Sequence, residues 1–364
     1  MTVLFISNEG ESLGLAMRVK NEGYSTYFYT ERDNAEWVGE GLVDKTIVGR
    51  RLTRVSGECI ASNVNRLISE VKPDLVIVDG KSMGKVADYI KEQNIPVFGS
   101  SYWTDSLSTS PPYVTQLSHR IGIDMWEGEK GVSVECGVWW NGLSSLSPFL
   151  VYNEDRFMDN SLGMSIPSAG NVVRSISPTS KLYKESIEKM ERLLKKSKFR
   201  GVLSIGCVVT KGKVYCTHFT SSLIYFPSLL EIYKGSVTDL LSSTANGRKS
   251  DGQFTADCAL SFLLSTPPYP ISAPAEYAPI KGISPSNLKH VYLLDVQKRE
   301  EKYEAAEASG KIMWVSARGR DVGEAKKRVQ KTISNLSIPD IQYRMDIGRR
   351  VDRDESLLNN WKYI

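Results

Sequence analysis

Arginines near the carboxyl end of the chain are the side chains whose type and spacing most clearly indicate a chemistry. They are Arg318, which follows an apolar run, and Arg344, Arg349 and Arg350 of the sequence YRMDIGRR. Guanidinium groups bind phosphate through paired, charge-assisted hydrogen bonds, so these arginines could form a phosphate-binding face. The sequence leaves open the alternative that they form a surface network of ion pairs around Asp346.

The loop of residues 7–12, with the sequence SNEGES, is a second candidate because it joins an apolar run to a helical pattern. Gly10 and Gly14 match only part of the dinucleotide-binding fingerprint GxGxxG, so the loop is weak evidence for dinucleotide binding. The loop can still bind an anion, because unpaired N–H groups at a helix start favour phosphate or carboxylate. The structural alternative is a tight turn between strand and helix.

The histidines and cysteines do not have the spacing of a metal site or of a nucleophile with its base. No HxxxH, HxxE or P-loop sequence occurs, so the sequence predicts no metal site. His218 lies in a strand pattern and is expected to be a core or edge histidine, and nothing indicates a lowered thiol pKa for Cys216. The cysteines are scattered without CxxC spacing, which favours a reducing compartment over a disulfide framework. They are Cys59, Cys136, Cys207, Cys216 and Cys258.

The composition is that of a globular protein. The chain has 364 residues, of which 41% are hydrophobic and 24% charged, and its formal net charge is +4. This length indicates two or three domains, and the balance of residues excludes a disordered chain. The small net charge does not favour nucleic acid as a partner, which would need a concentrated basic face. No apolar run approaches the ~18 residues of a membrane span, and no signal peptide is recognised, so we expect a cytoplasmic protein without a membrane partner.

Residues 1–100 have the pattern of an open α/β domain. The run 75–78 is apolar throughout, as in a parallel strand that is buried on both faces. Ligands of such sheets bind beyond the carboxyl ends of the strands, which here are the loops 7–12, 79–83 and 99–102. The predicted strands are residues 3–6, 25–29, 75–78 and 95–98, and the predicted helices begin near residues 13, 60 and 83.

The remainder of the chain mixes strands and helices in a different order. Residues 131–140 alternate like a strand, and Asn141-Gly142 is a turn signal. Residues 153–170 are rich in Asn, Asp, Gly, Ser and Pro, which predicts a long surface or functional loop. The other predicted elements are a helix at 181–198, a hairpin of 201–209 and 213–219, a Pro-rich break at 267–279, strands at 290–296 and 311–316, and a helix at 321–336.

In this order the segments resemble the phosphoribosylamine–glycine ligase family, ATP-grasp enzymes of purine biosynthesis. The tail, at 317–319 and 343–349, resembles the family's ARG-type loop and its closing YRxDIGxR segment. Residues 127–142 resemble its EGxExSVExxxDG segment. The front strands at 73–78 and 95–100 resemble its PDLVVV and IPVFGPS strands. The resemblance covers nearly the whole chain.

The resemblance implies an α/β fold in three parts. An N-terminal open parallel sheet, like that of the pre-ATP-grasp domain, is expected at residues 1–105. A reduced α+β ATP-grasp core is expected at 106–265, and a small C-terminal α+β domain at 266–364. The substrate side of the family's site is the better preserved side in this chain. The resemblance therefore implies these substrate-binding residues: Asn8, Glu9, Gly10, Ser12, Gly99, Ser100, Arg318 and Arg344.

Two departures concern the ATP side. The family has an ATP-covering lobe between its GIP and EGxE segments, but here Ile123 is followed almost at once by Glu127, so the lobe is predicted to be absent. Where the family has the Glu and Asn that bind magnesium, this chain has Cys216 and His218. Thiol and imidazole do not replace the hard oxygen ligands that magnesium needs.

These departures favour a degenerate, non-catalytic homologue that acts as a binding, regulatory or structural protein. It would need no cofactor, and its partner would be a small phosphorylated metabolite or another protein. The alternative left open is an active carboxylate–amine ligase. Such an enzyme would use ATP and Mg²⁺ to join glycine, or a similar carboxylate, to phosphoribosylamine or another amine.

Overall fold

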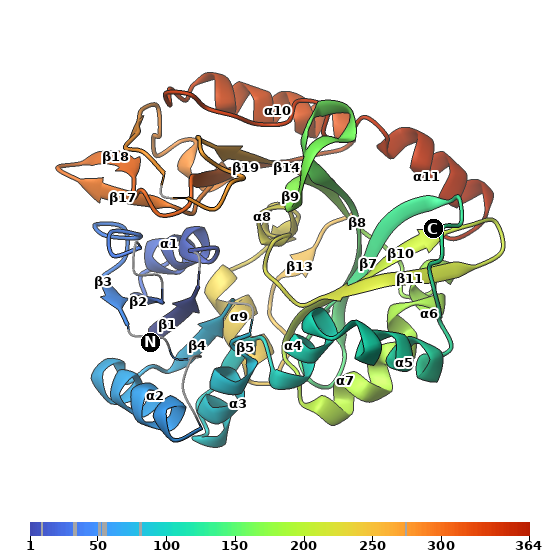
Figure 1. Cartoon of the computed structure of the whole chain (residues 1–364), viewed down its shortest axis with the longest axis horizontal. Coiled ribbons are helices and arrows are strands. Elements are labelled where there is room, and N and C mark those ends of the chain that lie inside the picture. Colours follow the sequence, from blue (N-terminus) through green and yellow to red (C-terminus); the bar gives the residue numbers. More distant parts are fainter. Residues whose placement is uncertain (9, 32–34, 50–51, 53–56, 80–81, 274) are drawn as a thin grey trace.

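Two large sheets organise the chain. The computed structural model describes residues 1–8, 10–31, 35–49, 52, 57–79, 82–273 and 275–364, and for residues 57–60 the backbone alone. A five-stranded sheet formed by the first hundred residues lies beside a nine-stranded sheet formed by the rest (Figure 1).

The five-stranded sheet is parallel throughout, in the order β3-β2-β1-β4-β5. Helix α1 packs on one face, where Val3 and Phe5 belong to the larger core, and α2 and α3 cover the other, where Leu4 and Ile6 face a smaller core (Figure 1). Both faces are therefore buried, as the continuous apolar runs predicted. The elements are β1 (Thr2–Ser7), α1 (Leu13–Asn21), β2 (Ser25–Thr30), β3 (Lys45–Val48), α2 (Gly57–Val71), β4 (Leu75–Val78), α3 (Gly84–Glu92) and β5 (Val97–Gly99).

The nine-stranded sheet has the order β16-β19-β14-β9-β8-β7-β10-β11-β6, and its strands pair antiparallel except β11 with β6. Its strands are β6 (Asp124–Met125), β7 (Val132–Trp140), β8 (Ser145–Met158), β9 (Leu162–Ser175), β10 (Gly201–Val209), β11 (Val214–Thr220), β14 (Cys258–Ser265), β16 (Val291–Leu293) and β19 (Lys311–Gly319). Small sheets pair β12 (Tyr233–Lys234) with β13 (Gln253–Phe254), and β15 (Pro279–Ile280) and β17 (Val296–Arg299) with β18 (Lys302–Ala305).

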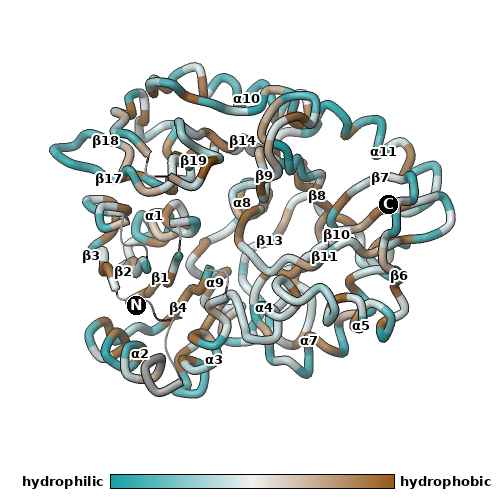
Figure 2. The backbone as a smooth tube through the Cα atoms, viewed as in Figure 1, coloured by the Kyte–Doolittle hydropathy of each residue, from teal (hydrophilic) through white to brown (hydrophobic). Residues whose placement is uncertain are grey.

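Helices surround this second sheet (Figure 1). They are α4 (Tyr102–Thr109), α5 (Pro111–Ile121), α6 (Lys181–Glu185), α7 (Glu191–Ser197), α8 (Phe226–Glu231), α9 (Val237–Ala245), α10 (Val322–Ser334) and α11 (Val351–Asn360), with short 3-10 turns η1 (Asp159–Ser161), η2 (Ile187–Met190) and η3 (Leu288–His290). The brown, hydrophobic stretches of Figure 2 follow the strands, and the teal stretches follow outer helices and loop tips. Among the described residues, no helix is both long and apolar enough to span a membrane.

The connection between α5 and β7 has no room for an additional lobe. Residues 122–131 leave α5 through Gly122, which adopts a left-handed conformation, and contain only the two-residue strand β6 before β7 begins. This is the place where the sequence predicted that the ATP-covering lobe is absent.

Two predicted elements are wrong. Residues 153–170 are not a loop but most of the β8–β9 hairpin, which turns at η1 with Asn160 and Ser161 in the left-handed region. The turn-forming residues that suggested a loop lie in the outer part of this hairpin, where many side chains are exposed. The helix predicted at 181–198 is interrupted at Ser186, whose backbone leaves the helical region and whose hydroxyl donates to the carbonyl of Leu182 at 2.5 Å.

The boundary predicted at residue 265 falls at the end of β14. Strands from either side of it, β14 and β19, are neighbours in the nine-stranded sheet. The division into three domains stays a prediction.

Glu22, which follows α1, caps the amino-terminal end of α9. Its carboxylate accepts hydrogen bonds from Ser236 Oγ at 2.6 Å and from the N–H groups of Val237 and Thr238 at 2.7 and 2.9 Å. The first N–H groups of a helix have no partner within the helix, and the helix dipole favours a negative charge there. Glu22 therefore ties the first layer of the fold to a helix more than two hundred residues away in sequence.

We expect Glu22→Gln to lower the free energy of unfolding at pH 7 by about 1 kcal/mol, the usual size of a lost helix cap. Partial burial raises the pKa of Glu22, but the hydrogen bonds from Ser236, Thr238 and Val237 outweigh it and lower this pKa below its ordinary 4.5. The contribution is thus present above that pH and is lost as the pH falls through the folded pKa. Urea unfolding should show the difference at pH 7 and its loss in acid. Glu92→Gln, at an exposed position ending α3, is the matched control, and an equal loss in it would contradict the assignment.

Candidate functional site

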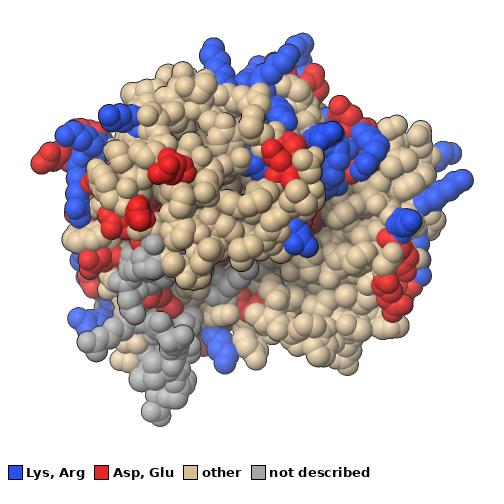
Figure 3. Space-filling view, turned by 45° about the horizontal axis from the view of Figure 1, so that its top comes forward, with Lys and Arg blue, Asp and Glu red and all other residues tan. Residues whose placement is uncertain are grey.

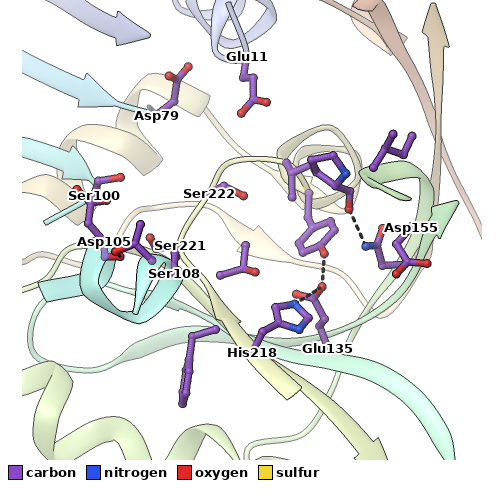
Figure 4. A pocket seen from close by; sticks show the side chains of 18 of the residues that line it. Glu11, Asp79, Ser100, Asp105, Ser108, Glu135, Asp155, His218, Ser221 and Ser222 are labelled. Carbon is purple, nitrogen blue, oxygen red and sulfur yellow. Dashed lines mark hydrogen bonds and ion pairs between the residues drawn. The ribbon is translucent and has the colours of Figure 1, made fainter. Parts of the chain in front are cut away.

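A pocket of about 340 Å³ lies where the carboxyl ends of the parallel strands face the nine-stranded sheet. Figure 4 shows Asp79, Ser100 and Asp105 on one side of it and Glu135, Asp155 and His218 on the other. This volume is in the range of small-molecule sites. The described lining residues are Glu11, Asp79, Ser82, Ser100, Asp105, Ser108, Thr109, Glu135, Asn153, Asp155, Ser165, Ile166, Pro167, His218, Phe219, Thr220, Ser221, Ser222, Ile224 and Tyr225.

The first wall comes from the loops that follow the parallel strands and from α4. Asp79 follows β4 directly and is buried, and Asp105 of α4 accepts a hydrogen bond from the N–H of Gly84 at 2.6 Å. Burial, and then the charge of Glu11, raise the pKa of Asp79 to about 7, and burial raises the pKa of Asp105 to about 6. This wall therefore holds carboxyl groups that gain or lose a proton near neutral pH.

The opposite wall is built around the buried carboxylate of Glu135 on β7. It accepts hydrogen bonds from Ser204 Oγ at 2.6 Å and from the hydroxyl of Tyr225, and lies 3.4 Å from His218 Nε2. Burial raises the pKa of Glu135, but the hydrogen bond and charge of His218 outweigh it and lower this pKa. Burial lowers the pKa of His218, and the Glu135 carboxylate outweighs that effect and raises it. Each group therefore favours the charged form of the other.

A glycine between the two strands makes this pair possible. Glu135 on β7 and His218 on β11 both stand opposite Gly206 of the intervening strand β10. A Cβ atom at position 206 would overlap the imidazole ring of His218 and the hydroxyl of Thr217. Because Gly206 has no side chain, His218 can reach across β10 to Glu135.

The predicted loops each contribute to the pocket, but the predicted residues do not all lie in it. Ser100 lines it, and Glu11 lines it from the loop that contains Gly10 and Ser12. Gly10 lies against the carbonyl of Leu294, and Ser12 is buried at the start of α1. Asn8 directly follows β1, Gly99 ends β5, and Glu9 lies outside the described residues.

The two predicted arginines lie apart from the pocket and from each other. The side chain of Arg344 is 3% exposed and forms ion pairs with Glu154 at 2.9 Å and with Asp346. Arg350 pairs with Glu154 at 2.8 Å, so Arg344 and Arg350 do form ion pairs, but the network is largely buried and shares Glu154 instead of lying on the surface around Asp346. Arg318 lines two other hollows beside α10.

The acidic groups of the pocket were not among the residues predicted from the sequence. Asp79 had a signal, since it ends a fully apolar strand at the edge where ligands bind. Glu135 also had one, because it is a single carboxylate within the otherwise apolar strand sequence VSVECGVWW. Asp105 and Asp155 carry no comparable signal, because only the fold brings α4 and β8 to the same pocket.

The described residues do not fit the magnesium site that the resemblance implies. Cys216 is fully buried, and burial raises the pKa of its thiol to about 11, so the thiol stays neutral. His218 is engaged by Glu135, whose own oxygens already accept from Ser204 and Tyr225. Within the described part of the chain, no group of three or more His, Cys, Asp or Glu side chains is arranged to hold a metal ion.

The charge around the pocket is negative. Five carboxylates line it, and no Lys or Arg does so among the lining residues that the structure describes. One of the five, Glu11, is 3.3 Å from Lys311, and Glu135 is balanced by His218. On the outer surface shown in Figure 3, Lys and Arg lie among Asp and Glu rather than in one broad basic surface. The acidic character is therefore local to the pocket.

Comparisons with known proteins agree with the fold. No protein-family model matches the chain. The chain is 24% identical over 160 residues to the phosphoribosylamine–glycine ligase of Streptomyces coelicolor, and the match covers 42% of this chain but only 38% of that relative.

Solved structures are similar over most of the chain. The phosphoribosylamine–glycine ligase of Thermotoga maritima superposes with a TM-score of 0.68 at 15% identity, covering 96% of this chain and 100% of that chain. The phosphoribosylglycinamide synthetase of Anaerococcus prevotii gives 0.60 at 12%, covering 93% and 98%. A bacterial biotin carboxylase domain gives 0.61 at 12%, covering 99% and 100%. The chain therefore has the α/β fold of these proteins, and over 160 residues it is similar in sequence to a phosphoribosylamine–glycine ligase.

Proposed function

We propose that the chain is a ligand-binding relative of the phosphoribosylamine–glycine ligases that does not carry out ATP-dependent ligation, and that its pocket binds a small organic cation. The carboxylate lining of the pocket carries this proposal. Nucleotide triphosphates are polyanions, and without a metal ion they are repelled by a lining in which five carboxyl groups face a single imidazole, that of His218. The same lining attracts an ammonium group.

The lack of ligation is supported by two features of the ATP side. Residues 122–131 connect α5 to β7 without a lobe that could cover a nucleotide. Cys216 and His218 stand where the family's magnesium ligands are expected, and neither fits this ion. The acyl-phosphate step of a ligase would lose its main charge stabilisation, a contribution of several kcal/mol. The cysteines Cys136, Cys207, Cys216 and Cys258 are free, which supports a reducing compartment such as the cytoplasm as part of the proposal.

Two carboxyl groups of the pocket are expected to make cation binding depend on pH. Asp79 and Asp105 have pKa values raised to about 7 and about 6, because burial disfavours their charged forms. A bound cation favours those charged forms, so binding is coupled to loss of a proton. Coupling to the single group Asp79 should raise the affinity about tenfold between pH 6 and pH 8.

The experiment has two arms. In the first, the protein is mixed with ATP, Mg²⁺, glycine and phosphoribosylamine, and we expect no phosphate release above the background. In the second, calorimetry with 1,4-diaminobutane should show binding that strengthens from pH 6 to pH 8, a range in which alkylammonium groups keep their charge. Asp79→Asn should remove most of this pH dependence and leave only the smaller part due to Asp105.

The matched control for the second arm is Asp352→Asn, the same exchange at an exposed position of α11. It should bind the diamine as the wild-type chain does. Phosphate release that requires both co-substrates would overturn the proposal in favour of the ligase alternative. Absence of diamine binding by the wild-type chain, or binding by Asp79→Asn that strengthens from pH 6 to pH 8 as much as that of the wild type, would overturn the cation assignment.

A further inference from the structure

A second hollow, of about 450 Å³, lies between α10, the end of β19 and the segment that contains η3. It shares no lining residue with the acidic pocket. Its described lining residues are Ser286, Asn287, Lys289, His290, Ala317, Arg318, Arg328, Lys331, Thr332 and Asn335. Arg328, Lys331, Thr332 and Asn335 recur at three- and four-residue spacing, so a single face of α10 forms one side of the hollow.

The charge of this hollow is opposite to that of the pocket. Lys289, Arg318, Arg328 and Lys331 line it, and none of the lining residues that the structure describes is an Asp or Glu. Arg328 is held in place, since its guanidinium donates to the carbonyl of Arg318 at 3.0 Å and pairs with Glu324 at 2.7 Å. For the side chains of Lys289, Arg318 and Lys331, the described residues provide no hydrogen bond or ion pair. Three cations therefore converge on the hollow without a counter-charge there.

A buried carboxylate fixes the imidazole at the edge of the hollow. His290 Nδ1 lies 3.1 Å from both carboxylate oxygens of Glu231, whose side chain is 6% exposed behind it on α8. Tyr292 donates to the same carboxylate at 3.4 Å. This carboxylate sets the orientation of the ring through Nδ1, so the other ring nitrogen, Nε2, is the one that can hydrogen-bond a ligand.

We propose that this hollow binds the phosphate group of a small phosphorylated metabolite. Arginine and lysine donate charge-assisted hydrogen bonds to phosphate oxygens, and here they come from three separate elements around one space. Asn287, Thr332 and Asn335 add neutral donors and acceptors of the kind that bind the hydroxyl groups of a sugar. The site is independent of the cation pocket and does not rest on the function proposed above.

The test measures phosphate binding by the full chain at constant ionic strength. Calorimetry and thermal unfolding with inorganic phosphate, and then with ribose 5-phosphate, should show saturable binding by the wild-type chain. Arg318→Gln should weaken the binding about tenfold or more, because it removes a charge-assisted contact. The double variant Arg318→Gln/Lys331→Gln should abolish it.

Lys327→Gln is the matched control, because it removes one charge from the same helix at an exposed residue that does not line the hollow. It should bind phosphate as the wild-type chain does, and so should Asp79→Asn from the other pocket. The proposal is overturned if the wild-type chain does not bind millimolar phosphate, if Arg318→Gln binds as well as the wild type, or if Lys327→Gln loses as much. The last result would mean that only the general charge of α10 attracts the anion.

Discussion

Replacing Arg344 with methionine is expected to lower the free energy of unfolding by about 3 kcal/mol, toward the lower end of what breaking a buried ion pair costs. Arg344 is buried between Glu154 and Asp346, and its guanidinium also donates to the carbonyl of Arg156 at 3.2 Å. Methionine fills much of the volume but leaves both carboxylates with fewer partners in a poorly solvated place. Glu154 keeps Arg350 at 2.8 Å, which limits the loss.

Arg349 is the matched control for this exchange. It lies in the same sequence YRMDIGRR, but it is exposed, and the hydrogen bond found for its side chain runs to Asn160 at 3.2 Å. Urea unfolding should show a change of less than about 0.5 kcal/mol for Arg349→Met. Arg344→Lys keeps the charge and should lie between the two. If Arg344→Met unfolds as the wild type does but loses a ligand, the residue binds substrate, as the family resemblance implied.

Most of the strands in the first hundred residues could be predicted because they are marked by their own local sequence. The runs at 3–6 and 75–78 are apolar without interruption, and only a sheet covered on both faces buries such runs completely. Strand β3 could not be recognised, because Lys45–Val48 is short and half-exposed at the sheet edge. Its place is decided by pairing with β2, which is a tertiary contact.

Two predicted elements are wrong because the residue types of the segment suggested a different backbone structure from the one it adopts. Residues 153–170 contain the residues of turns, yet they form the outer part of a long hairpin whose strand pairing outweighs their weak strand preference. The helix predicted at 181–198 has the correct apolar spacing, but the pattern does not record the break at Ser186. The hairpin depends on strand pairing, whereas the break in the helix coincides with the local hydrogen bond from Ser186 to the carbonyl of Leu182.

The site was predicted at the level of loops rather than of side chains. The carboxyl ends of β1, β4 and β5 do lead into the pocket through Glu11, Asp79 and Ser100. A shared edge follows from the sheet topology alone. The opposite wall could not be predicted, because the meeting of Glu135 with His218 depends on the register of three strands.

Replacing Gly206 with alanine should break that meeting. The new Cβ would overlap the ring of His218, which must turn away because the strands on both sides hold the backbone in place. Overpacking of this kind costs about 2 kcal/mol. The buried carboxylate of Glu135 also loses its charged partner, while Ser204 and Tyr225 remain.

Nuclear magnetic resonance can follow the effect directly, because the chain has only 3 histidines. The pKa of His218 should lie above its ordinary 6.5 in the wild-type chain and fall to or below that value in Gly206→Ala. Gly212→Ala is the matched control, since a Cβ there, at the tip of the same hairpin, would contact nothing. It should leave both the stability and the titration of His218 unchanged.

The pH dependence of the stability loss separates the ion pair from simple overpacking. The lowered pKa of Glu135 makes its contribution present above its ordinary value of 4.5 and lost as the pH falls through the folded pKa. The raised pKa of His218 makes its contribution present below 6.5 and lost as the pH rises through the folded pKa. The difference between the wild type and Gly206→Ala should therefore be largest between these two values and shrink on either side. A difference that stays constant across this range would mean that Gly206 serves packing alone and that His218 and Glu135 do not act as an ion pair.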